Sequence, residues 1–100
     1  MITTKSKNSI SNLTSSDISA RLKQGWLIPG HVSDTQFWLL VGISSMHSEK
    51  IINALFDFLV KGRARKDACN EYSVNSGHFS IGLNRLQYIS HTAAKMAEYY

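Results

Sequence analysis

The sequence has little proline, a single cysteine and no long apolar run, and each shortage excludes a class of protein. Pro29 is the only proline, so long helices are permitted, and the six glycines do not form a low-complexity linker. Cys69 is the only cysteine, which excludes an intramolecular disulfide and fits a reducing cytosol. The longest apolar run, residues 37–43, is too short to span a bilayer, and the first 17 residues lack the apolar core of a secretory signal. We therefore expect a cytoplasmic protein.

Charge is sparse but unevenly distributed. Charged residues make up 18% and hydrophobic residues 43% of the 100 residues, which is typical of one folded domain rather than a disordered chain. The net charge is +4, and four of the basic side chains fall within residues 61–66, with no acid among them. Such a cluster is suited to a phosphate backbone. The alternative is a solvated helix end, where cations are also favourable, so charge alone favours nucleic acid only slightly.

The apolar pattern predicts an all-α fold, a small helical domain of about five helices that contains a helix-turn-helix. Apolar residues recur every three or four positions, and no segment alternates with period two for long. Residues 1–16 are polar without periodicity and are predicted to be a flexible N-terminal arm. Residues 17–100 are predicted to form a single domain. The expected helices cover residues 17–24, 34–44, 48–60, 65–72 and 76–99.

The helix expected at residues 34–44 is apolar nearly all round. A helix of that kind is buried, either in its own domain or against another subunit. Complete burial is hard to achieve in so small a chain, so we expect this helix to make a homo-oligomer, at least a dimer. The predicted interface side chains are Phe37, Trp38, Leu40 and Val41.

The helix-turn-helix is expected at about residues 65–86. Two short helices that cross steeply need small residues where they touch and apolar residues at fixed offsets. The expected packing residues are Ala68, Cys69, Tyr72, Val74, Phe79 and Leu83. The match is imperfect, because Ser73 stands where such a turn usually has glycine. Short helical hairpins without DNA-related function share the pattern, so it is only moderately specific.

The residues around this motif predict its contacts with DNA. Short polar side chains lie on the exposed N-terminal face of the second helix, where they can approach DNA closely, and basic side chains flank the first helix. Phosphate contacts position a protein, whereas base or groove contacts specify the site. The predicted DNA-binding residues are Arg63, Arg65, Lys66, Asn75, Ser76, His78, Ser80, Asn84 and Arg85. The alternative for Asn84 and Arg85 is that they form the solvated side of a core helix.

No pattern in the sequence indicates catalysis or metal binding. The four histidines are scattered, and none lies three or four positions from another histidine or from Cys69, so we expect no zinc site. There is no glycine-rich phosphate loop, and no nucleophile, base and oxyanion site can be recognised. We expect no enzyme activity, no cofactor and no small-molecule ligand.

Four segments of distinctive sequence carry a resemblance to a known family. They are residues 27–30, 37–48, 65–69 and 72–80, and the most specific is Gly-Ile-Ser-Ser-x-His-Ser at residues 42–48. Together they resemble the PapB family of fimbrial (adhesin) operon transcription regulators over residues 26–86. The resemblance implies control of an adhesin operon through oligomers on AT-rich promoter DNA, with contacts like those of minor-groove recognition. It also associates Arg65 and Cys69 with DNA binding, although packing between helices is the more natural role for Cys69.

These observations predict a cytoplasmic, nucleoid-associated transcription regulator of a fimbrial operon that binds AT-rich double-stranded DNA as an oligomer. The use of the major or the minor groove stays open. The alternative is a helical protein–protein interaction module that acts on another regulator through residues 34–44 and does not bind DNA itself. Neutralising Arg63, Arg65 and Lys66 would leave such a module fully active.

Overall fold

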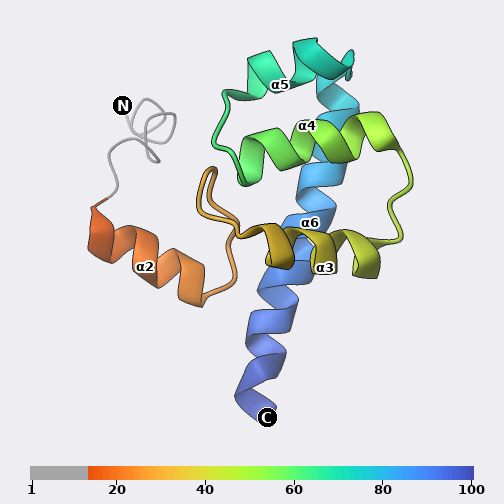
Figure 1. Ribbon diagram of the computed structural model, residues 1–100. Coiled ribbons are helices and arrows are strands. Elements are labelled where there is room, and N and C mark those ends of the chain that lie inside the picture. The colour runs from red at the N-terminus through yellow and green to blue at the C-terminus, as the bar shows by residue number, and fades with distance from the viewer. Residues whose placement is uncertain (1–13) are drawn as a thin grey trace.

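The described part of the chain consists of helices and the turns between them. The computed structural model describes residues 14–100 and contains five α-helices and a terminal 3-10 turn in this range (Figure 1). They are α2 (Ser15–Lys23), α3 (Asp34–Ser44), α4 (Glu49–Leu59), α5 (Arg65–Tyr72), α6 (Ser76–Met96) and η1 (Ala97–Tyr99). The predicted all-α fold is confirmed. No helix in this range is both long and apolar enough to cross a membrane. The predicted arm lies outside the described residues except for its last three.

Side-chain caps determine where the helices begin. The Ser33 hydroxyl accepts a hydrogen bond from the Gln36 backbone N–H at 3.1 Å, and α3 begins at the predicted residue. α2 begins two residues earlier than predicted, because Thr14 is its cap and exchanges two hydrogen bonds with Asp17. The last helix is slightly shorter than predicted, since it gives way to the 3-10 turn after Met96.

The core lies where α3 and α4 pack on the first two thirds of α6, with α5 packed against α4. In Figure 1, α4 and α3 cross in front of α6 at different heights, α5 lies beyond α4, and α2 stands apart from these helices. The largest side chains that are completely buried come from α3, α4 and α6: Phe37, Leu55, Leu59, Phe79 and Leu86. α2 buries no residue. Packing of apolar side chains between these helices therefore stabilises residues 34–90.

Helix α3 is half inside this core, which corrects the predicted oligomer interface. Phe37, Leu40 and Val41 are only 0%, 6% and 8% exposed, because α4 and α6 cover that side of the helix. These three side chains are therefore unavailable to a second subunit. The opposite side carries Trp38, Leu39 and Ile43, which are 49%, 64% and 66% exposed. Of the four residues predicted for the interface, only Trp38 faces solvent.

The loop after α2 is fastened to the second half of α6. The Gln87 side chain exchanges two hydrogen bonds with the backbone of Leu27, each 2.8 Å long. Trp26 stacks on His91, with ring centroids 4.1 Å apart and planes inclined by 10°. These contacts place the loop against α6 at a point about 60 residues further along the chain.

Gly25 lies against α6 with no room for a side chain. We therefore expect alanine at Gly25 and alanine at Gly42 to have opposite effects on stability. Gly25 has φ +85°, and a Cβ there would lie 2.5 Å from the Ser90 carbonyl oxygen. Gly42, in α3, would place a Cβ in open space. We expect Gly25→Ala to lower the free energy of unfolding by more than about 1 kcal/mol, or several degrees in Tm. Gly42→Ala should raise it by about 0.5–1 kcal/mol, because alanine is the better helix former. Thermal unfolding followed by circular dichroism measures both, and equal effects would contradict the close approach at Gly25.

Candidate nucleic-acid interface

Helices α5 and α6 are joined by a tight turn, residues 73–75, which we call the elbow. Ser73 ends α5 in the left-handed conformation at φ 55°, ψ 46°, where glycine is more usual. The Val74 N–H donates to the Cys69 carbonyl at 2.9 Å. Asn75 then caps α6, and its side-chain oxygen accepts hydrogen bonds from the backbone N–H groups of Gly77 at 2.7 Å and His78 at 3.3 Å. The elbow therefore closes through local hydrogen bonds.

The side chains predicted to pack the motif lie in or against the core. Ala68 and Phe79 are completely buried, and Cys69 is 9% exposed. Tyr72, Val74 and Leu83 are half-buried and pack against the same cluster. Phe79 also meets Phe58 of α4 edge to face, with centroids 5.4 Å apart. The first turn of α6 is thereby fixed to α4.

Arg65 connects the start of α5 to the start of α6. Its Nη2 donates to the Ser76 carbonyl oxygen at 3.1 Å, to the Ser76 hydroxyl at 3.3 Å and to the Ser80 hydroxyl. Its guanidinium carbon lies 4.7 Å from the centroid of the Phe79 ring. Arg65 and Ser80, both predicted to bind DNA, are thus half-buried partners that position α6.

Arg63, also predicted to bind DNA, is held by two carboxylates. Its Nη1 donates to Asp57 at 2.8 Å and to Glu71 at 2.6 Å. Asp57 is only 3% exposed, and it also accepts a hydrogen bond from the Tyr72 hydroxyl at 3.1 Å. Lys61 lies 3.6 Å from the same carboxylate. Most of the Arg63 charge is therefore compensated within the chain.

The pKa of Asp57 reflects two opposed effects. Burial of this carboxyl raises its pKa, but the hydrogen bonds from Arg63 and Tyr72 and the charges of Lys61 and Arg63 lower it by more, so the pKa lies below its ordinary value. Asp57 was not singled out in the sequence. The signal that could have found it is a lone acid inside an apolar helix, with a basic residue four and six positions later.

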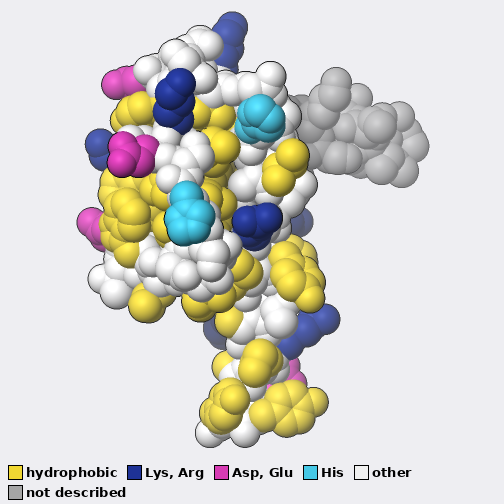
Figure 2. All heavy atoms as spheres, turned by 90° about the vertical axis from the view of Figure 1, so that its right-hand side faces the viewer, with side chains coloured by type: hydrophobic (Ala, Val, Ile, Leu, Met, Phe, Trp, Pro, Cys, Tyr) yellow, Lys and Arg dark blue, Asp and Glu magenta, His cyan; other side chains and the backbone are white. Residues whose placement is uncertain are grey.

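The first half of α6 presents a mainly polar face to solvent, opposite its core side, with one cation, Arg85, and one apolar side chain, Ile81. The core side carries Phe79, Gly82 and Leu86, all buried. The exposed positions among residues 75–85 are Asn75, Ser76, Gly77, His78, Ile81, Asn84 and Arg85. No acidic residue occurs in α6, and Lys66 is exposed on the neighbouring α5. Figure 2 shows basic, acidic and histidine side chains among apolar ones on the body, and apolar side chains gather at the projecting end below.

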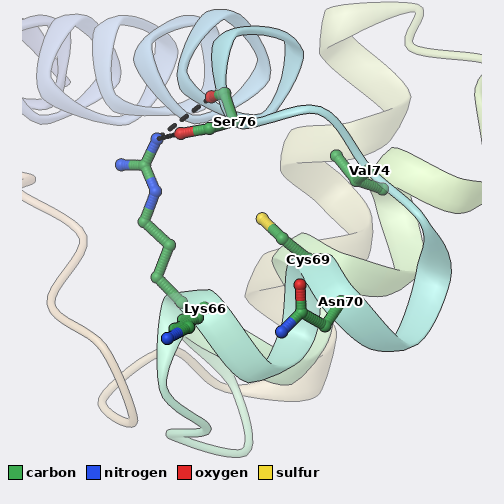
Figure 3. A pocket seen from close by; sticks show the side chains of 6 residues that line it. Lys66, Cys69, Asn70, Val74 and Ser76 are labelled. Atoms are coloured by element: carbon green, nitrogen blue, oxygen red, sulfur yellow. Dashed lines mark hydrogen bonds between the residues drawn. The ribbon is translucent and has the colours of Figure 1, made fainter.

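A cavity of about 480 Å³ opens between α5 and the start of α6 (Figure 3). Six residues line it: Arg65, Lys66, Cys69, Asn70, Val74 and Ser76. No group of three histidine, cysteine, aspartate or glutamate side chains that could hold a metal occurs within residues 14–100. The lining offers hydrogen-bond donors and two cations and contains no acidic side chain. Such a combination favours the binding of anionic groups.

The comparisons with known proteins identify the class and then the family. Residues 7–100 match the family model for the adhesin biosynthesis transcription regulatory proteins, so the chain is a transcription regulator by family. It belongs to the PapB family, as the resemblance in the sequence indicated.

Individual relatives agree with this assignment. The chain is 44% identical over 79 residues to the major pilus subunit operon regulatory protein PapB of Escherichia coli, covering 79% of this chain and 76% of that one. It is 49% identical over 77 residues to the AFA-III adhesin operon regulatory protein of Escherichia coli, covering 77% and 76%. The crystal structure of Escherichia coli FocB matches with a TM-score of 0.70 and 41% identity, covering 87% of this chain and 99% of that chain.

The Asp57 cluster predicts a stability that falls at acid pH. Asp57→Asn should lower the free energy of unfolding by about 2–3 kcal/mol near neutral pH, because Arg63 loses its buried partner. The Asp57 pKa is lowered in the folded chain, so its contribution is complete above about pH 4–5 and is lost as the pH falls through the folded pKa. Urea unfolding of the native chain and of the Asp57→Asn variant across pH 2–7 measures this difference in the free energy of unfolding.

The control for this prediction is Asp67→Asn on the exposed surface of α5, which should change stability by less than about 0.5 kcal/mol. The stability difference between the native chain and the Asp57→Asn variant should shrink toward acid pH. A difference that stays constant down to pH 2 would contradict the charged state assigned to Asp57.

Proposed function

We propose that this chain regulates an adhesin operon by binding double-stranded DNA, with α5, the elbow and α6 acting as a helix-turn-helix. The observation that carries the proposal is the exposed first half of α6, which is polar and free of acids while its opposite side is fixed in the core. Short polar side chains at the start of a helix can reach base edges or backbone, as recognition helices do. A protein that acts in this way works where the DNA is, in the cytoplasm.

The structure favours a division of roles among the predicted DNA-binding residues. Lys66 and Arg85 are exposed, and neither makes an ion pair with the described residues, so their charges are available for phosphates. His78 and Asn84 are exposed beside them on α6. Arg65 acts first as a positioning residue, through its bonds to the start of α6. Asn75 and Ser76 are exposed and also have structural roles. Asn75 caps α6, and Ser76 accepts hydrogen bonds from Arg65.

The preference for AT-rich DNA rests on the family resemblance. AT-rich segments have a narrow minor groove with a strongly negative potential, which favours inserted basic side chains. Arg85 is the basic side chain of α6 best placed for this, since it is exposed on the proposed DNA face. A minor-groove competitor in the binding assay decides which groove is used.

The contact residues predict a specific loss of DNA binding. Lys66→Ala and Arg85→Ala should each weaken binding to an AT-rich duplex about tenfold, and each should lower the slope of log K against log salt by about 1. Neither should change Tm by more than a degree or two, because both side chains are exposed. Fluorescence anisotropy at several salt concentrations measures affinity and slope.

The matched control is Lys95→Ala, in the last turn of α6 and far from the elbow in the chain, which should leave DNA affinity nearly unchanged. Salt-independent binding by the native chain would contradict the proposal. So would a double Lys66→Ala, Arg85→Ala variant that still regulates its operon, which is the result expected of a protein-interaction module.

Oligomerisation is proposed to use the solvent-facing side of α3. Trp38, Leu39 and Ile43 form a contiguous set of exposed apolar side chains on one helix, and such patches mark interaction surfaces. The Trp38 side chain is held in place by the core, since its ring stacks on Phe56 with centroids 5.8 Å apart. Oligomers on DNA gain affinity because the contacts of linked subunits add.

This interface predicts that a polar α3 surface prevents assembly. The double variant Leu39→Ser, Ile43→Ser should shift the protein toward monomer in sedimentation velocity and reduce cooperativity on long AT-rich DNA, without loss of helicity. Tyr88→Ser is the control, because Tyr88 is similarly exposed, at 71%, but lies on α6 beyond the proposed DNA face. Assembly that survives the double variant, or that is lost with Tyr88→Ser alone, would place the interface elsewhere.

A further inference from the structure

The cavity beside the elbow has a size and a lining that a DNA backbone alone does not account for. Its volume of about 480 Å³ lies in the range of small-molecule pockets. A duplex lying across α5 and α6 would touch the rim of this cavity, whereas the side chain of Cys69 points into its interior in Figure 3. The interior is therefore open to a ligand that is smaller than DNA.

Unused polar groups line this interior. The Cys69 thiol is nine-tenths buried and makes no hydrogen bond with the described residues. Arg65 uses Nη2 for its bonds to α6, and its Nε makes no hydrogen bond with residues 14–100. Lys66, at the rim, has no ion-pair partner in the same range. No acidic side chain lines the cavity.

The lining also has an apolar part, formed by Val74 and the body of Cys69. A ligand that matches both parts carries a compact anion for Arg65 and Lys66 and an apolar body for this wall. Guanidinium and ammonium groups both bind phosphate well, since each donates charge-assisted N–H bonds to its oxygens.

We propose that this cavity binds a free phosphate monoester with an apolar body, and that the ligand competes with DNA. The competition rests on the proposed function, because Arg65 and Lys66 border both surfaces. A ligand that binds only the DNA-free form lowers the apparent DNA affinity in proportion to its occupancy. The chain would then be a regulator that responds to a small metabolite.

Phenyl phosphate is a suitable probe, because it has both chemical parts and no base to pair with DNA. In two-dimensional amide NMR at constant ionic strength, we expect saturable shifts at Cys69, Asn70 and Val74, with weaker binding of inorganic phosphate and of phenol. Lys66→Gln should weaken phenyl phosphate binding about tenfold, the loss of one charge-assisted contact, whereas Lys95→Gln should leave it unchanged.

Several results would overturn the proposal. They are shifts that do not saturate, shifts unaffected by Lys66→Gln, and inorganic phosphate or phenol binding as tightly as phenyl phosphate. Inorganic phosphate that binds as tightly as phenyl phosphate would indicate a site for phosphate alone. Phenol that binds as tightly would indicate a purely apolar pocket.

A second experiment separates this proposal from the proposed function. Phenyl phosphate at fixed ionic strength should lower the affinity for an AT-rich duplex in anisotropy, and saturating duplex should abolish the amide shifts that phenyl phosphate causes. If the chain binds DNA but not phenyl phosphate, the cavity proposal fails and the function stands. If it binds phenyl phosphate at these residues but no DNA, the function fails and the cavity site stands, without its competition.

Discussion

The burial of Phe79 under Arg65 is the contact on which the candidate interface depends. Phe79 sits in the first turn of α6 and is completely buried against α4, and Arg65 lies over its ring while bonding the start of the same helix. A helix start held from two sides has a fixed direction. The exposed face of α6 therefore keeps one orientation relative to α5, which a surface that reads DNA needs.

Most basic side chains of the cluster at residues 61–66 make contacts within the chain and stabilise its fold. Lys61 and Arg63 both face the buried Asp57, and Arg65 holds α6. Lys66 and Arg65 make no ion pair with the described residues, but Arg65 is half-buried and bonded to α6, so only Lys66 is exposed with a free charge. The charge that drives the proposed DNA binding is therefore spread over Lys66, the acid-free α6 and Arg85, rather than concentrated in the cluster. Because α4 carries Asp57 and also packs on α6, the same helix links the ion pairs to the proposed DNA face.

The helices could be predicted from the sequence because their signals are local. The bounds predicted for α3 and α5 agree with the structure, and the Ser33 hydroxyl that caps α3 lies directly before the helix that it starts. The roles of single side chains could not be predicted in this way. Because α3 is apolar nearly all round, its sequence does not indicate which side faces α6, and the predicted interface therefore included three core residues, Phe37, Leu40 and Val41. Arg63 and Arg65 have partners 6 to 15 positions away, and folding alone brings them together. The cavity likewise exists only once the elbow has closed.

The most direct test of the central claim is to map where DNA touches the chain. Amide NMR shifts on adding a short AT-rich duplex, compared with a GC-rich duplex of equal length, report this residue by residue. We expect the largest shifts along residues 76–85 and at Lys66, stronger with the AT-rich duplex, and small shifts along the second half of α6. Shifts concentrated on α2 or on the C-terminal end of α6, with residues 76–85 unaffected, would contradict it.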